Sequence, residues 1–210
     1  MRDADFATVI LAAGAGSRLG GHGKALLRVN GISLVAKALA TALEAGTRPV
    51  LVLGHRAHEV RQHLNAESSK EFREATCVVS EWMGGLSVSF RVGVRSAADS
   101  GASAIAVLLV DQPGISPEAL RTVINARVAG RITRGMIGSR ASHPVSLSTS
   151  DAVTASLQAI GDEGARRFLQ ANHHRVDDID ITRFTRFTDL DTPEDLDRYR
   201  RIQALEKNSH

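Results

Sequence analysis

Four short apolar runs in the first half of the chain, with helical patterns between them, limit it to a small set of folds. The runs are rich in Val, Ile and Ala and occupy residues 7–13 (ATVILAA), 49–53 (PVLVL), 76–79 (TCVV) and 104–110 (AIAVLLV). Each run is continuous and not alternating, which is typical of strands covered on both faces. Helices are predicted over 33–45, 57–64 and 86–98, and another begins at Ser116-Pro117-Glu118. This alternation predicts an α/β fold of three layers with a mostly parallel central sheet.

The second half of the chain has a looser pattern. Residues 136–147 predict strands around a loop, and residues 176–189 predict two short strands. Helices are predicted over 150–159, 165–171 and 193–205, the last with Asp191-Thr192 as its cap. The chain has no internal repeat, low-complexity tract or linker, and 210 residues are enough for one sizeable core. A single domain over residues 1–210 is therefore expected.

Composition argues against several classes of function. The formal charge is only +3, the basic residues are scattered, and the aromatic residues (4%) form no ladder with them, so we expect no nucleic-acid partner. One cysteine excludes an intrachain disulfide and any zinc site built from several cysteines. The acidic start and the shortness of the run 7–13 argue against a signal peptide and a membrane span. We therefore expect a cytoplasmic protein with no membrane partner.

The segment after the first predicted strand is the most informative one. It reads LAAGAGSRLG over residues 11–20 and is followed by Lys24. Small residues directly after a parallel strand let the backbone approach a ligand, and exposed N–H groups there bind phosphate oxygens. The pattern Gly14-x-Gly16 also opens the dinucleotide sites of nicotinamide-dependent oxidoreductases, or simply joins a strand to a helix. Two cations, Arg18 and Lys24, and the lack of an acidic residue after the second strand favour a triphosphate.

Two aspartates are the candidates for a metal site. Asp111 stands at the carboxyl end of the fourth run, where open α/β sheets bind their ligands. Asp191 precedes the last predicted helix, a place where aspartate commonly caps the helix and binds no metal. Magnesium in proteins is held by one or two carboxylates together with substrate phosphates. Two carboxylates and a cationic phosphate loop therefore favour Mg2+ as cofactor.

In order and spacing these motifs resemble the MobA-like nucleotidyltransferases, most closely the molybdenum cofactor cytidylyltransferase branch. The resemblance covers nearly the whole chain, and its anchors are 11–14 (LAAG) with Arg18 and Lys24, 54–55 (GH), 85–87 (GLS), 111–113 (DQP), 143–145 (HPV), 161–166 (GDEGAR) and 189–196 (DLDTPEDL). Members have a Rossmann-like fold and join the NMP of an NTP to a phosphorylated acceptor with magnesium, releasing pyrophosphate. The resemblance implies CTP and molybdopterin as substrates, and an apo molybdenum hydroxylase as the partner that receives the product.

The resemblance also implies roles position by position. Arg18, Lys24 and Asp111 would be catalytic, and Asp111 with Asp191 would bind the metal. The residues implied to bind the nucleotide are Leu11, Ala12, Ala13, Gly14, Gly16, Arg18, Lys24, Gly54, His55 and Ser87, and those implied to bind the acceptor are Arg140, His143, Asp162 and Arg166. Residues 1–130 would form the nucleotide-binding half and residues 131–206 the acceptor-binding and closing half.

A few residues bear on substrate choice. Ala13 stands where guanylyl-transferring relatives usually have Gly, and its methyl narrows the pocket in favour of CTP over GTP. Ser80 and Ser142 replace the usual Asn and Gly, which leaves the identity of the acceptor open. His143 precedes Pro144 on extended backbone and is either an acceptor contact or a polar loop residue. Three alternatives stay open: use of GTP or another phosphorylated acceptor, a nicotinamide-dependent oxidoreductase, and a non-catalytic chaperone that delivers a cofactor.

Overall fold

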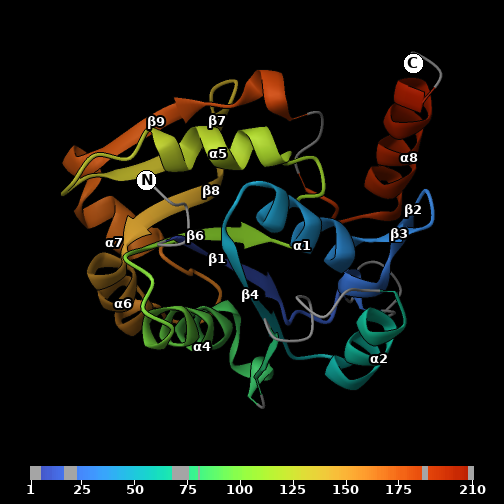
Figure 1. Cartoon of the computed structure of the whole chain (residues 1–210), viewed down its shortest axis with the longest axis horizontal. Helices are drawn as coiled ribbons and strands as arrows, with labels where there is room; N and C mark the ends of the chain where they lie inside the picture. Colours follow the sequence, from blue (N-terminus) through green and yellow to red (C-terminus); the bar gives the residue numbers. More distant parts are fainter. Residues whose placement is uncertain (1–5, 17–22, 68–75, 80, 186–188, 208–210) are drawn as a thin grey trace.

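A seven-stranded sheet forms the centre of the molecule (Figure 1). The structure is a computed structural model and describes residues 6–16, 23–67, 76–79, 81–185 and 189–207. The strand order is β5 (Thr76–Val78), β4 (Arg48–Leu53), β1 (Phe6–Ala12), β6 (Ala104–Leu109), β8 (Arg140–Ser148), β7 (Ile132–Ile137) and β9 (Val176–Asp180). All run in one direction except β8, which pairs antiparallel with β6 and β7. The predicted α/β fold with a mostly parallel sheet is confirmed.

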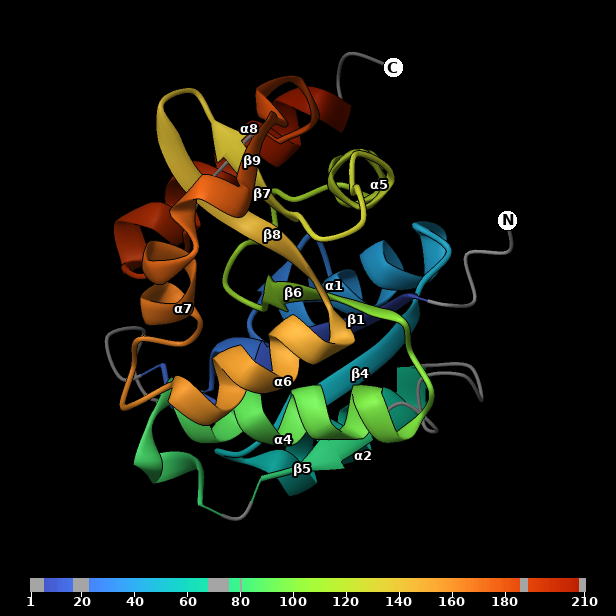
Figure 2. The same cartoon turned by 90° about the vertical axis from the view of Figure 1, so that its left-hand side faces the viewer.

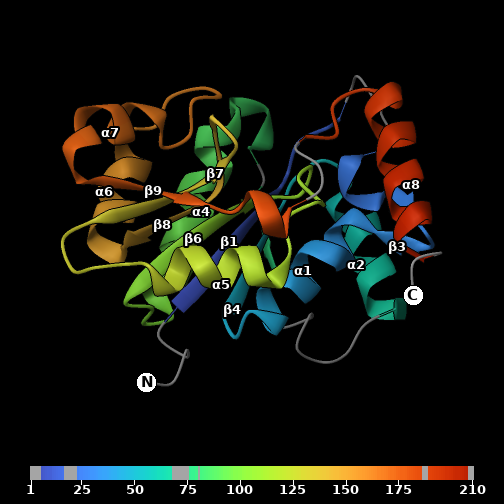
Figure 3. The same cartoon turned by 90° about the horizontal axis from the view of Figure 1, so that it is seen from above.

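Helices cover both faces of this sheet. One face carries α1 (Leu34–Glu44), α2 (Ala57–Glu67), α5 (Pro117–Asn125) and α8 (Pro193–Lys207), and the other carries α4 (Leu86–Asp99), α6 (Thr149–Gln158) and α7 (Arg166–Ala171). Side chains of β1 alternate between the two layers: Ile10 packs on the α1 side and Val9 on the α4 side. Gly93 lets α4 approach closely, because a Cβ there would lie 2.5 Å from Val9 Cγ1. Figure 2 shows α4 and α6 side by side, and Figures 1 and 3 place α8 across the molecule from them.

Helix starts follow the capping residues of the sequence. Ser33 Oγ accepts from Ala36 N at 3.3 Å before α1, and Ser116 Oγ accepts from Ala119 N at 3.2 Å before α5. A small hairpin, β2 (Arg28–Val29) and β3 (Ile32–Ser33), is absent from the sequence prediction. Its signal is the pair Asn30-Gly31, whose φ angles of 53° and 84° are those that a two-residue hairpin turn requires.

Of the two strands predicted over residues 176–189, the first forms as β9, and part of the segment expected for the second lies outside the described residues. After β9 the chain turns through a 3-10 helix, Thr182–Phe184. The cause is Asp180, whose Oδ1 accepts from the backbone N of Thr182 at 2.9 Å and from its hydroxyl at 2.6 Å. Such an aspartate-centred turn competes with strand pairing. Beyond it, Thr185 makes one bridge to Ile115, and residues 186–188 lie outside the described residues.

The carboxyl ends of β1, β4 and β6 meet at one edge of the sheet, and the C-terminal segment is fastened to that edge. Leu190 N donates to Asp111 O at 2.8 Å, directly after β6. The buried hydroxyl of Tyr199, on α8, donates to Pro113 O at 3.0 Å. Residues far apart in the sequence are thereby brought to the loop after β6. None of the helices in the described part of the chain is long and apolar enough to cross a membrane.

Candidate functional site

The loop after β1 places its backbone against the side chain of Lys24. Gly16 has a φ of 61°, and a Cβ on it would lie 2.6 Å from Lys24 Cγ and 3.0 Å from Lys24 N. Glycine is therefore required here both by the backbone conformation and by space. Lys24 itself begins a short 3-10 helix, η3 (Lys24–Leu26). Arg18, the other cation expected beside this loop, lies outside the described residues.

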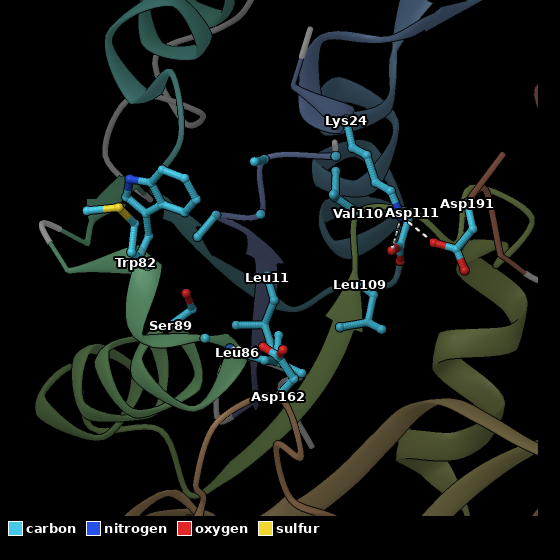
Figure 4. A pocket seen from close by; sticks show the side chains of 16 residues that line it. Leu11, Lys24, Trp82, Leu86, Ser89, Leu109, Val110, Asp111, Asp162 and Asp191 are labelled. Atoms are coloured by element: carbon cyan, nitrogen blue, oxygen red, sulfur yellow. Dashed lines mark hydrogen bonds and ion pairs between the residues drawn. The ribbon is translucent and has the colours of Figure 1, made fainter. Parts of the chain in front are cut away.

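Lys24 lies between two carboxylates, as Figure 4 shows. Its Nζ donates to Asp111 Oδ2 at 2.9 Å and to Asp191 Oδ1 at 2.6 Å. Burial of the ammonium acts to lower the pKa of Lys24, but the charges and hydrogen bonds of Asp111 and Asp191 outweigh it and raise the pKa above 10.5. Lys24 is therefore a cation at neutral pH. The structure brings together these three residues, which are distant in the sequence.

The position of Asp191 depends on its neighbours. Leu190 is fully buried and ties the segment to Asp111 by the backbone hydrogen bond described above. The helix α8 is capped by Thr192, whose Oγ1 accepts from Asp195 N at 3.2 Å, while Asp195 Oδ2 accepts from Thr192 N at 3.0 Å. Because Thr192 is the cap, the prediction that gave part of this role to Asp191 is wrong. The Asp191 carboxylate is left free of the helix end.

The two carboxylates have the chemistry of a divalent cation site. Both present an oxygen to the same ammonium nitrogen, so these two oxygens lie no further apart than the sum of the two distances. Asp111 Oδ1 is buried and has no hydrogen-bond partner among the described residues. Within the described residues, no three His, Cys, Asp or Glu side chains converge on one point. A hard cation would therefore need substrate oxygens to complete its ligands, as magnesium commonly does.

A cavity of about 610 Å³ opens beside these groups (Figure 4). Among the residues singled out from the sequence, those that line it are Leu11, Ala13, Gly14, Gly16, Lys24, Asp111, Asp162 and Asp191. It is also lined by Ala15, Trp82, Met83, Gly85, Leu86, Ser89, Leu109 and Val110. Figure 4 shows Trp82 on the opposite side from Lys24 and the two aspartates. The cavity therefore has a charged end and an aromatic end.

Four residues that were expected to bind the nucleotide lie outside this lining. Ala12 packs in the core on the α1 side of the sheet. Ser87 is buried at the start of α4, where its N–H donates to Gly161 O at 2.8 Å. Gly54 and His55, which follow β4, pack behind the aromatic end of the cavity. Any role of these residues in nucleotide binding would therefore be exerted through their neighbours.

A second cavity, of about 800 Å³, adjoins the first. The two share the lining residues Leu11, Leu86, Leu109, Asp111, Asp162 and Asp191. Its floor is apolar, with Phe90 and Val107 among its residues. Its rim carries charges of both signs, including Arg134, which donates to Asp178 at 2.8 Å. Two cavities therefore meet at the Lys24–Asp111–Asp191 cluster.

The second cavity contains three of the four residues expected to bind the acceptor. His143, Asp162 and Arg166 line it, whereas Arg140 is exposed at the start of β8 and outside its lining. Burial lowers the pKa of His143, against a smaller opposing effect of Asp111 and Asp189. The half-buried His143 is therefore neutral at pH 7.

Several lining residues were given no site role by the sequence prediction. Gln112 is nine-tenths buried, and its Nε2 donates to Asp189 Oδ1 at 2.7 Å. The alternation Asp-Leu-Asp around a buried leucine was a usable signal for Asp189, since residues on either side of a buried one both reach the surface. The sequence carried no such signal for Arg134 and Trp82. Arg134 reaches the second cavity from strand β7 and Trp82 reaches the first from a turn, and residue spacing predicts neither position.

Comparison with known proteins gives one family. The model described as MobA-like NTP transferase domain matches residues 8–176. Nicotine blue oxidoreductase of Paenarthrobacter nicotinovorans is 34% identical over 198 residues, which cover 90% of this chain and 94% of that protein. Purine catabolism protein PucB of Bacillus subtilis is 30% identical over 210 residues, which cover 97% of this chain and 100% of PucB. The family model ends before Asp189 and Asp191, which line the second cavity, whereas the similarity to PucB covers nearly the whole chain.

A solved structure has a similar fold. Rv0371c of Mycobacterium tuberculosis, in complex with manganese, superposes with a TM-score of 0.73 and 25% identity over 92% of this chain and 96% of that one.

Proposed function

Since this chain belongs to the MobA-like NTP transferase family and is a nucleotidyltransferase, we propose that it transfers CMP from CTP to the phosphate of a molybdopterin-type acceptor. The observation that carries the proposal is the pair of adjoining cavities that share Asp111, Asp162 and Asp191. A transfer between two bound substrates needs two sites that meet at the reacting atoms. The methyl group of Ala13 in the first cavity favours the smaller base.

The reaction needs positioning more than it needs a protein nucleophile. An oxygen of the acceptor phosphate forms a bond to the α-phosphorus of CTP, the bond from that phosphorus to the bridging oxygen breaks, and pyrophosphate leaves. The backbone of Gly14 to Gly16 and the ammonium of Lys24 lie where they would hold the triphosphate. His143 and Arg166 would orient the acceptor from the second cavity.

Asp111 and Asp191 would hold a magnesium ion together with the substrate phosphates. The cation would neutralise the negative charge of the phosphates when bound. The proposal is supported by the buried, unpartnered Oδ1 of Asp111 and by the manganese present in the similar structure of Rv0371c.

The test is pyrophosphate release with purified protein, magnesium and molybdopterin, with CTP and GTP competing in one reaction. Product masses give the ratio of the two nucleotides. We expect about ten- to two-hundred-fold preference for CTP, the range that one or two misplaced heavy atoms in a pocket produce. The variant Ala13→Gly should relax it. Preference for GTP in the wild type, or an unchanged ratio in the variant, would contradict the cytidylyl assignment.

A second candidate, a nicotinamide-dependent oxidoreductase, is favoured by one observation, the 34% identity to nicotine blue oxidoreductase. Against it, Gly54 and His55 follow β4 where dinucleotide folds usually place an acidic residue for the ribose. A thermal-shift comparison separates the two. CTP with magnesium should raise the melting temperature and NAD(P)H should not. The opposite pattern, with NAD(P)H oxidised on addition of a heteroaromatic acceptor, would favour the oxidoreductase.

A further inference from the structure

Trp82 forms the aromatic end of the first cavity and is the only tryptophan of the chain. It lies in a 3-10 turn, η4 (Trp82–Gly84), between β5 and α4. Figure 4 shows its indole at the cavity, across from Lys24 and Asp111. The residue is half-buried and is one of those that line the cavity.

The indole is supported from behind by the turn that follows β4. The rings of Trp82 and His55 meet edge to face at 5.1 Å, and His55 N donates to Ala13 O at 3.0 Å. A Cβ on Gly54 would lie 2.5 Å from Trp82 Cβ and 2.8 Å from Ala13 Cβ. The backbone of Gly54 is outside the left-handed region, so glycine is needed here for space. Its lack of a side chain lets Trp82 and Ala13 form one continuous wall.

The turn that carries Trp82 is also anchored from the front. Gly85 has a φ of 91° and donates to Trp82 O at 3.2 Å. A Cβ on Gly85 would lie 2.8 Å from the backbone carbonyl of Gly161. The next residue, Leu86, donates its N–H to Asp162 Oδ1 at 3.0 Å. The indole therefore stands on a turn whose C-terminal end is fixed and is supported from behind by His55, which is how a preorganised binding surface is built.

From this arrangement we propose that Trp82 is the platform on which the nucleobase of the bound NTP stacks. The inference rests on the proposed function, because it places an NTP in the first cavity. The triphosphate requires the charged end at Lys24, so the base reaches toward the opposite end. Every base offers a π-face to an aromatic ring, and stacking is therefore tolerant of base identity. Trp82 supplies affinity for CTP and GTP alike, and Ala13, in the same wall, supplies selectivity.

The fluorescence of the single tryptophan tests the contact directly. Wild-type protein with magnesium is titrated with CTP, with GTP, and with inorganic tripolyphosphate, which has the phosphates but no base. Excitation is set where the nucleotides do not absorb. We expect CTP and GTP to quench the emission and tripolyphosphate to bind, as measured by calorimetry, with little quenching. Equal quenching by tripolyphosphate would overturn the proposal.

Two variants separate stacking from a role in folding. Trp82→Ala should weaken CTP and GTP binding by the same factor, about ten- to a hundred-fold, the loss expected for one aromatic–base stack. Trp82→Phe, which keeps a ring, should recover most of the affinity. Tripolyphosphate affinity and the melting temperature should stay near the wild-type values in both. Undiminished CTP affinity in Trp82→Ala, or an equal loss for CTP and tripolyphosphate, would overturn the proposal.

Failure of the stacking proposal and failure of the proposed CMP transfer would give different experimental results. If CMP transfer to the acceptor were absent, the wild type would release no pyrophosphate, yet its fluorescence would still report whether a base stacks on Trp82. If only the stacking proposal failed, turnover with CTP would persist in Trp82→Ala with an unchanged KM. An unchanged CTP-to-GTP ratio in Trp82→Ala, beside a shifted ratio in Ala13→Gly, is the result expected from their separate roles.

Discussion

At the scale of single residues, the ammonium of Lys24 occupies the point where the carboxylates of Asp111 and Asp191 converge. One positive charge is shared by two negative ones, so the cluster as a whole is anionic. An anionic cluster repels a triphosphate unless a further cation is present. This balance is the physical reason to expect that magnesium, and not Lys24 alone, brings the phosphates to this end of the cavity.

Removal of either carboxylate tests this balance. Asp111→Asn and Asp191→Ala should each lose several kcal/mol of transition-state stabilisation, as expected when a bound Lewis-acid cation is lost. The measurement is pyrophosphate release at saturating magnesium. Asp197→Asn, which changes an exposed aspartate on α8, is the matched control and should keep full turnover. Near-normal turnover in both site variants would refute the metal pair.

The neutral state of His143 gives a pH dependence. Burial lowers its pKa below 6.5, while the unfolded chain takes up the proton near 6.5. The unfolded state therefore binds more protons over this range, and stability is complete above pH 6.5 and decreases as the pH falls through the lowered pKa. We expect the melting temperature of the wild type to fall more steeply below pH 6.5 than that of His143→Gln. The control variant His58→Gln, at an exposed position, should keep the wild-type dependence of melting temperature on pH. If His143→Gln also kept this dependence, the pH effect could not be attributed to His143.

At the scale of elements, the start of α8 links helix stability to the site. Thr192 caps this helix directly after Asp191, whereas Ser116 caps α5 away from the cavities' shared cluster. Thr192→Ala and Ser116→Ala should each lower the free energy of unfolding by about 1 kcal/mol. Only Thr192→Ala should also reduce turnover, because fraying of the first turn releases Asp191 from Lys24. Urea unfolding measures the loss of stability, and pyrophosphate release measures turnover. Equal turnover in the two variants would show that the Thr192 cap does not hold Asp191 in place.

The elements differ in how far the sequence determines them. The runs at 7–13, 49–53 and 104–110 are strands within one or two residues of their predicted ends, since continuous Val and Ile runs have few other solutions. The turn directly after β9 was missed because it depends on one aspartate side chain, which accepts a hydrogen bond from the backbone of Thr182. Likewise, spacing alone could not assign the cap to Thr192 in place of Asp191. Trp82 was unpredictable, since its place depends on the missing side chain of Gly54, a residue distant in sequence.

At the scale of the whole molecule, chain segments from both halves build one reaction centre. Strands β7, β8 and β9, from the second half, extend the sheet that β1, β4 and β6 begin. Residues of β8 and α7 line the second cavity, and α8 returns to the loop after β6 through Tyr199. The nucleotide and the acceptor would therefore be bound by different segments that share only the central cluster. Substitutions far from that cluster should affect one substrate and not the other.

Arg166 and Arg140 provide the sharpest test of this separation. The family resemblance implies both as acceptor contacts, but only Arg166 lines the second cavity, while Arg140 is exposed outside it. Arg166→Ala should raise the KM for molybdopterin about tenfold, the effect of losing one charge-assisted hydrogen bond that is partly exposed to water. Arg140→Ala should leave this KM unchanged, and neither variant should alter CTP affinity measured by calorimetry. A rise in the acceptor KM for Arg140→Ala alone would mean that the acceptor approaches along the β7–β8 hairpin and that the second cavity is not its site. An equal loss of CTP and acceptor binding in Arg166→Ala would mean that Arg166 supports the fold and that the two substrates are not bound separately.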